Sequence, residues 1–589
     1  MSSYRRSFIL ALLACAQSNA KVFDSFEQVQ HVKYDFIVVG GGTGGNVIAN
    51  RLTENPKFNV LVLEAGPSNS DVLPSEVPWL APTMWNTAFD WNYTTVPQVA
   101  LGGRPVAFPR GHILGGTSSI NFMMYTRGSS DQYDHWANIT KDPGWSWKNL
   151  KKYFDKNERW VAPADHHNTT GQFDPSVHSF NGTNFVSLAG FPTPIDGRII
   201  NATHQLGGQF KFNLDYSSGN PLGIGWLQNT VGGGQRSSSA TSYLGSQFIR
   251  RPNLHVLVNA QVGRLLQTSA GHVPGFRTVE FRQHVAGPVQ RVSASKEVII
   301  SAGTIGSPQV LLNSGIGPAE HLHSVGIRSI VNLSDVGSNF VDHCAVALPW
   351  LVNSNATFEQ IKEPEISAEL LNQWTVNHTG PFVDTLTSHL GFFHINNASR
   401  QHPAVGSLTP HYEFIISNGL IIPNPLVPAN GHFFSIATAL LSPASKGSIR
   451  LRSNNPYDPP LIDPAYLTND VDKSAMRTAI RAAMKFVTAP AWSGYILAPS
   501  GGMENITDDA SLDAFIEANA GTFFHPTSSN KMTHKGANNG VVDPDGKVKH
   551  VDGIRVVDAS IFPYIFSGHP QAPIYAFAER ISDLIKSSY

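Results

Sequence analysis

The sequence predicts a mixed α/β fold for this chain of 589 residues. An apolar run from Tyr34 to Val39 is typical of a buried strand, a glycine-rich turn follows it, and Ile48, Ala49 and Leu52 then recur at helical spacing. A second apolar run, residues 59–63, has the length of another buried strand. Because strand, helix and strand alternate here, we expect both strands to lie in one parallel sheet.

The turn after the first strand carries Gly40, Gly42 and Gly45 in the pattern GxGxxG. Without side chains there, the backbone can approach a pyrophosphate, while the helix N-terminus offers free N–H groups and the positive end of its dipole. Glu64 follows the second strand, where an acidic residue is expected to hold the ribose hydroxyls of an ADP moiety. The combination predicts a dinucleotide site and leaves both NAD and FAD open.

The charge balance limits the class of partner. The chain has 42 Lys and Arg residues against 43 Asp and Glu residues, a net charge of −1, and 14% of its residues are charged. Neutralising nucleic-acid phosphates needs a basic excess, so we expect no nucleic-acid partner. An apolar fraction of 41% excludes a mainly disordered chain. The expected partners are small molecules.

Residues 1–20 predict a secretory signal peptide. Arg5 and Arg6 precede an apolar run at 8–16, and the small residues at 18–20 suit cleavage before Lys21. That run is well short of the ~20 residues that span a bilayer, and no later segment is long and apolar enough, so we expect no membrane association. We therefore expect a secreted, extracellular protein.

Two further features bear on this localisation. Cys15 would leave with the signal peptide, so Cys344 would stand alone and no internal disulfide could form. In a secreted chain, Asn-x-Ser/Thr sequences are candidate glycan acceptors. They occur at Asn92, Asn138, Asn168, Asn181, Asn201, Asn332, Asn355, Asn377, Asn397 and Asn505.

Two segments further along the chain favour FAD over NAD. Residues 110–121 form a second glycine- and hydroxyl-rich segment, and residues 301–317 form a third. Both resemble, almost position for position, the two signatures of the glucose-methanol-choline oxidoreductase family of flavoproteins. Residues 337–343 and the tail at 541–560 also resemble this family, and the resemblance runs from about Tyr34 to the C-terminus.

Within that family, segments 90–95, 236–241 and 252–259 are most similar to the fungal branch of aryl-alcohol oxidases and pyranose dehydrogenases, and we place the chain closest to aryl-alcohol oxidase. In pyranose dehydrogenases a histidine at the place of Ile120 bonds the isoalloxazine. Isoleucine has no nucleophile, so we expect non-covalent FAD. The resemblance implies these cofactor-binding residues: Gly40, Gly42, Thr43, Gly44, Gly45, Glu64, Arg110, Gly115, Thr117, Ser118, Asn121, Phe122, Met123, Val262, Asp558, Ala559, Pro570 and Gln571.

The resemblance also implies two domains, each discontinuous in sequence. A Rossmann-like FAD-binding domain is expected at residues 33–165, 230–330 and 540–589. A substrate-binding domain, with a sheet flanked by helices, is expected at residues 166–229 and 331–539. We expect a monomer.

The C-terminal tail predicts one more element of the cofactor site. Residues 553–557 have the character of a short buried strand ending at Asp558, and Pro573 is expected to open an amphipathic helix. Free N–H groups near Gln571 to Ile574 and the helix dipole would stabilise negative charge on a reduced flavin.

Oxidising an alcohol by hydride transfer leaves a hydroxyl proton, and a histidine with a pKa near the working pH suits its removal. Among 23 histidines, two have a supporting context: His525 follows two phenylalanines, and His569 precedes the predicted C-terminal helix. By resemblance, His525 matches the catalytic base and His569 the second active-site position. Histidines expected to be structural or at the surface, with no spacing that predicts a metal site, are His166, His167, His343, His534 and His550.

Two positions depart from the family pattern. Ser528 stands where glycine is usual, and if its backbone needs a positive φ the substitution costs about 1 kcal/mol. Pro570 replaces a threonine and removes one N–H donor beside the flavin. Asn121 is expected to hydrogen-bond near the flavin, and capping of its own loop is the alternative.

Phe122, Ile421 and Phe524 are the predicted substrate-contacting residues, in a pocket that is apolar and offers few hydrogen-bonding side chains. We expect an oxidase that converts a primary aryl or allylic alcohol to an aldehyde and reduces dioxygen to hydrogen peroxide. One alternative is a dehydrogenase that passes electrons from a sugar to quinones. Another is a non-redox lyase or cyclase on the same scaffold.

Overall fold

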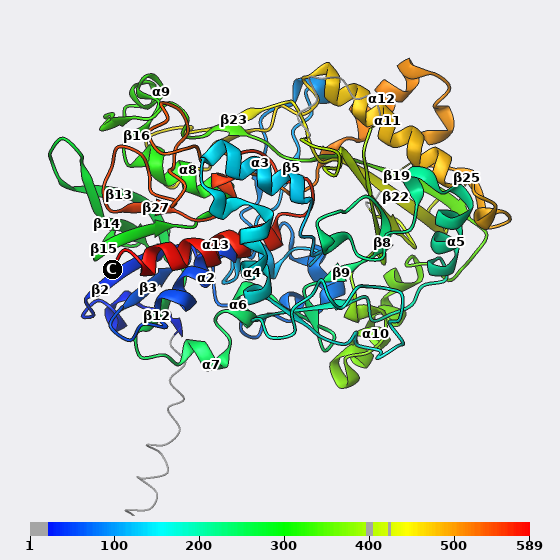
Figure 1. The fold of residues 1–589 in the computed structure, drawn as a ribbon, viewed down its shortest axis with the longest axis horizontal. Helices are drawn as coiled ribbons and strands as arrows, with labels where there is room; N and C mark the ends of the chain where they lie inside the picture. The colour runs from blue at the N-terminus through cyan, green and yellow to red at the C-terminus, as the bar shows by residue number, and fades with distance from the viewer. Residues whose placement is uncertain (1–21, 396–404, 422–425) are drawn as a thin grey trace, which may run out of the picture.

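The computed structural model describes residues 22–395, 405–421 and 426–589. The predicted signal peptide and the candidate acceptor Asn397 therefore lie outside the described residues. Across the described ranges, no helix combines the length and apolar character that a membrane crossing requires. Two sheets, on the left and right of Figure 1, organise the chain.

The first sheet has eight strands and carries the glycine-rich turn. The strands predicted at 34–39 and 59–63 are present, and they pair in parallel as expected. In spatial order the strands are β1 (Val22–Phe23), β12 (Leu254–Leu257), β3 (Val60–Leu63), β2 (Tyr34–Val39), β15 (Gln290–Ile300), β14 (Gly275–Arg282) and β13 (Gln261–Ser269), with β27 (Ile554–Val556) also paired to β15. The pairs among β13, β14 and β15 are antiparallel and the others are parallel.

The predicted N-terminal and C-terminal helices pack against each other. Helix α2 (Thr43–Leu52) follows the glycine-rich turn, and α13 (Gln571–Lys586), drawn in red, runs beside it in Figure 1. The prediction that Pro573 opens α13 is wrong by two residues, because the helix begins at Gln571. A proline is tolerated at the third position, since the first-turn N–H groups have no partner within the helix.

The second sheet is antiparallel, and helices flank it as predicted. Its order is β25 (Ile496–Pro499), β19 (Cys344–Val352), β22 (Phe433–Leu440), β21 (Tyr412–Ser417), β20 (His389–Phe393) and β8 (Gly223–Trp226), with β26 (Gly521–Thr522) paired to β19. Helix α11 (Asp470–Phe486) packs on β21 and β22, and α12 (Asp509–Asn519) packs on α11. All these strands fall in the segments predicted for the substrate-binding domain, whose exact boundaries remain a prediction.

The remaining helices and short strands connect the two sheets and cover them. The helices are α3 (Ser130–Thr140), α4 (Trp147–Asn157), α5 (Asp196–Leu206), α6 (Ser239–Ser242), α7 (Ser246–Ile249), α8 (Gly303–Asn313), α9 (Ala319–Ser324) and α10 (Pro364–Asn377). The short strands are β4 (Tyr93–Thr94), β5 (Ala107–Phe108), β6 (Glu158–Trp160), β7 (Asn184–Leu188), β9 (Gln228–Asn229), β10 (Val231–Gly232), β11 (Gln235–Arg236), β16 (Ile316–Gly317), β17 (Val331–Asn332), β18 (Ser338–Phe340), β23 (Gly447–Arg450) and β24 (Leu461–Asp463).

Candidate active site

A cavity of about 410 Å³ extends from the glycine-rich turn to the two histidines singled out in the sequence. Its size lies in the range of pockets that hold small molecules and cofactors. Both sheets contribute to its wall, because the ends of β2 and β3 lie at one side and side chains of β19, β21 and β22 at another. Of the predicted cofactor and substrate residues, all but Gly45 and Gly115 line it.

The N-terminus of α2 forms one end of the cavity. Gly42 caps the helix without a side-chain hydrogen bond, and the N–H groups of Thr43, Gly44 and Gly45 have no acceptor among the described residues. The first intrahelical bond runs from Asn46 N to Gly42 O, at 3.1 Å. Free N–H groups at a helix N-terminus, together with the helix dipole, suit a pyrophosphate.

Gly45 and Gly115 shape this end without lining the cavity. A Cβ atom on Gly45 would lie 2.0 Å from the carbonyl oxygen of Gly40, so only glycine lets the turn close against the helix. Gly115 adopts a φ of 95° and donates its N–H to Gly41 O at 2.7 Å. Both residues therefore shape the backbone at the cofactor end of the cavity. Their direct contact with the cofactor stays a prediction.

Two buried carboxylates hold the surrounding loops. Glu64 Oε2 accepts the N–H of Gly41 and Oε1 accepts the N–H of Gly66, both at 2.8 Å. Burial raises the pKa of Glu64 to about 7, against the favourable effect of these backbone donors. Asp558 Oδ2 accepts the Gly303 N–H at 3.0 Å, which fixes the start of α8 beside the cavity.

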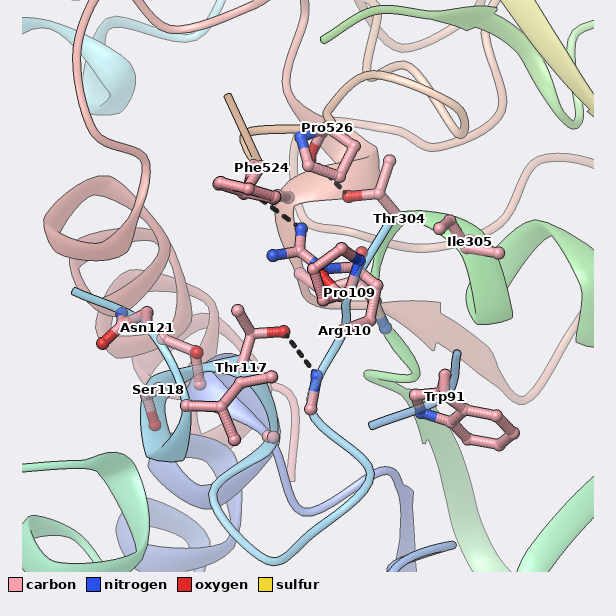
Figure 2. Close-up of a pocket in the computed structure, with 18 of the residues that line it drawn as sticks. Trp91, Pro109, Arg110, Thr117, Ser118, Asn121, Thr304, Ile305, Phe524 and Pro526 are labelled. Carbon is pink, nitrogen blue, oxygen red and sulfur yellow. Dashed lines mark hydrogen bonds between the residues drawn. The ribbon is translucent and has the colours of Figure 1, made fainter. Parts of the chain in front are cut away.

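The glycine- and hydroxyl-rich segment 110–121 crosses the middle of the cavity, as Figure 2 shows. Arg110 Nη1 donates to the Phe524 carbonyl at 3.0 Å, and burial lowers the pKa of Arg110 to about 10. Thr304 Oγ1 donates to the Pro526 carbonyl at 2.8 Å. These bonds tie two cofactor-binding segments to the chain on either side of His525.

Asn121 lies at the N-terminus of α13 and also caps its own loop. Its Nδ2 donates to Gln571 Oε1 at 2.9 Å, and its Oδ1 accepts the Met123 N–H at 3.0 Å. Arg236, a buried residue outside the predicted site, donates to the same Oδ1 at 2.9 Å. The side chain thus caps its own loop, and its hydrogen bond near the flavin stays a prediction.

Fewer free N–H groups occur at the start of α13 than predicted. Ile574 N donates to Pro570 O at 3.0 Å, and Pro573 has no N–H. Among the described residues, the N–H groups of Gln571 and Ala572 have no acceptor. These two donors and the helix dipole remain to stabilise negative charge.

His525 and His569 lie side by side at the other end of the cavity. Their ring centroids are 4.7 Å apart with planes at 77°. The backbone N–H of His525 donates to Asp342 Oδ1 at 2.7 Å, and the backbone N–H of His569 donates to Thr126 Oγ1 at 2.9 Å. Burial, and then the neighbouring charges of His569, His343 and Arg110, lower the pKa of His525 well below its usual value.

Glu413, which was not predicted, lies against His569. Its Oε1 is 3.0 Å from His569 Nε2, an ion-pair distance at which the two groups are not aligned for a hydrogen bond. Glu413 is fully buried in the central strand β21. No sequence signal singled it out, because a glutamate in an apolar strand shows its partner only after the sheet has formed.

His343 is the second residue that the sequence interpretation missed. The residue is fully buried, so of the two predicted alternatives, structural or surface, the structural one applies. Its Nδ1 lies 3.0 Å from Nδ1 of His525, a contact that the sequence did not indicate. The available signal was the segment 337–343, which resembles the family and ends at this histidine. Burial lowers the pKa of His343 to about 3.

An apolar wall lies next to the histidines. Phe122, Leu386, Ile421 and Phe523 pack in one cluster and line the cavity. Trp85 extends the wall, with its ring centroid 5.6 Å from Phe122 and 5.2 Å from Phe524. Phe523 reaches the histidines, with its ring centroid 4.8 Å from that of His525 and 5.6 Å from that of His569. Trp85, Leu386 and Phe523 were not predicted.

The unusual serine after His525 takes the conformation that the glycine pattern implied. Ser528 has a φ of 69°, so the cost of about 1 kcal/mol expected for a non-glycine residue applies. Its N–H donates to Ala559 O at 3.1 Å, which keeps the segment against the cofactor end of the cavity.

These features define a flavin-dependent oxidoreductase: a mainly parallel sheet with a free helix N-terminus, a second sheet with an apolar wall, and a histidine pair between them. The chain belongs to the GMC oxidoreductase family, whose models match residues 34–345 and 443–578. The family, the free donors of α2 and α13 and the acceptor oxygens of Glu64 all fit FAD.

Several known proteins are similar to this chain. A dehydrogenase named eriK from Hericium erinaceus is 40% identical over all of both chains, and pyranose dehydrogenase 3 from Leucoagaricus meleagris is 38% identical over 95% of this chain and 94% of its own. The structure of a formate oxidase from Aspergillus oryzae has a TM-score of 0.85 at 26% identity, covering 95% of this chain and 98% of its own. A fungal aryl-alcohol oxidase, with a TM-score of 0.79 at 24% identity over 94% and 99% of the two chains, is similar in fold.

Proposed function

We propose that this FAD-dependent GMC oxidoreductase converts primary aryl or allylic alcohols to aldehydes and reduces dioxygen to hydrogen peroxide. The observation that carries the substrate proposal is the position of His525 and His569 beside the apolar wall of Trp85, Phe122 and Phe523.

Oxidation removes a hydride from the carbinol carbon and a proton from the hydroxyl oxygen, which leaves a carbonyl. FAD, when bound, supplies the hydride acceptor. His525 takes the hydroxyl proton, because its depressed pKa keeps the ring neutral and able to accept a proton. Its backbone bond to Asp342 holds the ring in place for this transfer.

His569 orients the alcohol oxygen. Its ring lies 4.7 Å from that of His525, so one hydroxyl group can contact both imidazoles. Glu413 restrains the far side of the His569 ring from within a central strand. The apolar wall excludes water from the reacting carbon, which strengthens the electrostatic contacts made by both histidines.

The character of the wall favours an apolar substrate over a sugar. A planar aryl or allylic group would bury its surface against Phe122, Phe523 and Ile421 without leaving polar groups unpaired. A pyranose would bring several hydroxyls to a surface with few partners for them. The hydroxyl of Thr522, nearby, already donates to Asp342 and accepts from Phe524 N.

A dehydrogenase that reduces quinones is the second candidate. The similarity to a dehydrogenase at 40% identity and to a pyranose dehydrogenase at 38% identity supports this candidate. The electron acceptor would then be a quinone in place of dioxygen, and the roles of His525 and His569 toward the alcohol would be unchanged.

Steady-state kcat/KM for 4-methoxybenzyl alcohol, 2,4-hexadienol and glucose, each with dioxygen and with benzoquinone, tests the proposal. We expect both unsaturated alcohols to exceed glucose, with peroxide formed in amounts equal to the aldehyde. A higher value for glucose would contradict the substrate proposal. Turnover with benzoquinone alone would establish the dehydrogenase instead.

We also propose that the protein is secreted and glycosylated. The nine candidate acceptors in the described ranges all have exposed side chains. Deglycosylation of protein secreted by a eukaryotic host should lower its mass, and an unchanged mass would contradict this proposal.

A further inference from the structure

We propose that His343 is a positioning residue that holds His525 in the tautomer with its proton on Nδ1, so that Nε2 receives the hydroxyl proton of the substrate. The choice of atom rests on the proposed function, whereas the tautomer itself does not. The contacts of the two rings distinguish their nitrogen atoms.

The Nε2 atom of His343 must carry a proton. It lies 3.1 Å from the carbonyl oxygen of Leu441, and a carbonyl oxygen only accepts. The Phe566 carbonyl also acts to raise the pKa of His343, but the Leu441 contact is the one with hydrogen-bond geometry. Nε2 of His343 is therefore the donor nitrogen.

The other nitrogen of His343 must be bare. The ring is fully buried, and burial lowers its pKa to about 3, so the doubly protonated form is absent at neutral pH. A neutral imidazole has one donor and one acceptor nitrogen. Because Nε2 is the donor, Nδ1 of His343 is an acceptor.

This acceptor fixes the proton of the facing ring. Nδ1 of His343 lies 3.0 Å from Nδ1 of His525, and two bare nitrogens would repel at this distance. Nδ1 of His525 must therefore donate. Since the pKa of His525 is also lowered by burial, its ring is neutral and its Nε2 is bare.

The bare nitrogen is the one available to a substrate. Among the described residues, Nε2 of His525 has no hydrogen-bond partner, and His525 lines the cavity. The contacts from Leu441 through His343 to His525 thus leave the lone pair of His525 Nε2 free toward the space in front of the apolar wall. This series of hydrogen bonds ends at the Leu441 carbonyl, which cannot take a proton. It therefore positions the base and does not relay protons to solvent.

Backbone pairing keeps the two rings in register. Val341 and Thr527 exchange N–H to carbonyl bonds at 3.2 and 2.8 Å, and Phe523 N donates to His343 O at 2.9 Å. Asp342, between them, accepts the His525 N–H. The contact between the rings is therefore part of a ladder that forms when the two segments fold together.

The tautomer can be measured without any turnover. In holoenzyme labelled with ¹⁵N-histidine at neutral pH, nuclear magnetic resonance should show a pyrrole-type Nδ1 and a pyridine-type Nε2 for His525, with its signals assigned by their loss in His525→Gln. A pyridine-type Nδ1 on His525 would overturn the inference whichever substrate the enzyme uses.

Two substitutions at position 343 test the consequence. His343→Leu removes the acceptor, and we expect the limiting rate of anaerobic flavin reduction to fall ~10–100-fold, the usual effect of losing an orienting partner, while FAD content and alcohol affinity change little. His343→Asn can place an oxygen near the position of Nδ1 and should recover most of the rate. Equal rates in the wild type and His343→Leu, with both fully loaded, would contradict the positioning role. If His343→Leu fails to fold, the tautomer measurement on the wild type still decides.

Discussion

The Oε1 atom of Glu413 lies 3.0 Å from Nε2 of His569, and both side chains are almost fully buried. Glu413 belongs to β21, whose neighbours in the sheet are β20 and β22, so its position is set by backbone pairing on both sides. A carboxylate that cannot move away restrains the imidazole beside it. The orientation of His569 thus depends on a strand of the second sheet.

Glu413→Gln should slow anaerobic flavin reduction by ~10-fold, because it changes the group that faces Nε2 of His569 within a buried contact. The glutamine keeps the shape of the side chain and replaces the carboxyl group by an amide. Stopped-flow reduction with the best alcohol would measure the effect, and FAD content serves as the control for folding. An unchanged rate would show that Glu413 does not act on His569.

The pH dependence of reduction should reveal the depressed pKa of His525. Burial, and then the charges of its neighbours, disfavour the protonated ring, so the base stays neutral well below pH 6.5. We expect the limiting reduction rate to stay constant as the pH falls through about 6.5 and to decline only well below that value, whereas an ordinary histidine base would lose activity below about 6.5. A rate profile with a midpoint near the ordinary value would contradict the burial argument. Activity at pH 7 after each incubation controls for loss of protein.

Glu64→Ala should weaken FAD binding. The variant removes the acceptors of the Gly41 and Gly66 N–H groups, which hold the glycine-rich turn and the loop after β3. We expect FAD affinity to fall ~10–100-fold, because two buried hydrogen bonds of about 0.5–1.5 kcal/mol each are lost. The measurement is FAD retained per chain after gel filtration. Glu64→Gln, which keeps one acceptor oxygen, is the matched control and should retain more FAD.

Acid precipitation should release the flavin. Ile120 lines the cavity and has no nucleophilic atom, so we expect a yellow supernatant containing FAD and a colourless pellet. A pellet that retains the flavin after denaturation would show a covalent link through another residue. Mass spectrometry of the supernatant would identify the released cofactor.

The sequence by itself determined the features that are local in the chain. The strand, turn and helix from Tyr34 to Leu52 follow from apolar periodicity and from the glycine-rich turn between them. Glu64 was found from its short distance along the chain to the glycine-rich turn, whereas the cofactor residues of segment 110–121 came from the resemblance to the family. Even the positive φ of Ser528 could be anticipated from the residue type usual at that position.

The contacts that orient the two histidines were decided only by the tertiary structure. Glu413 reaches His569 because β21 pairs between two other strands, and His343 reaches His525 because residues 341–343 pair with residues 523–527. Hydrophobic periodicity predicts that such strands are buried, but it does not specify which strands become neighbours or in what register. Long-range pairing brings these side chains together, and it is also what gives each ring nitrogen its partner.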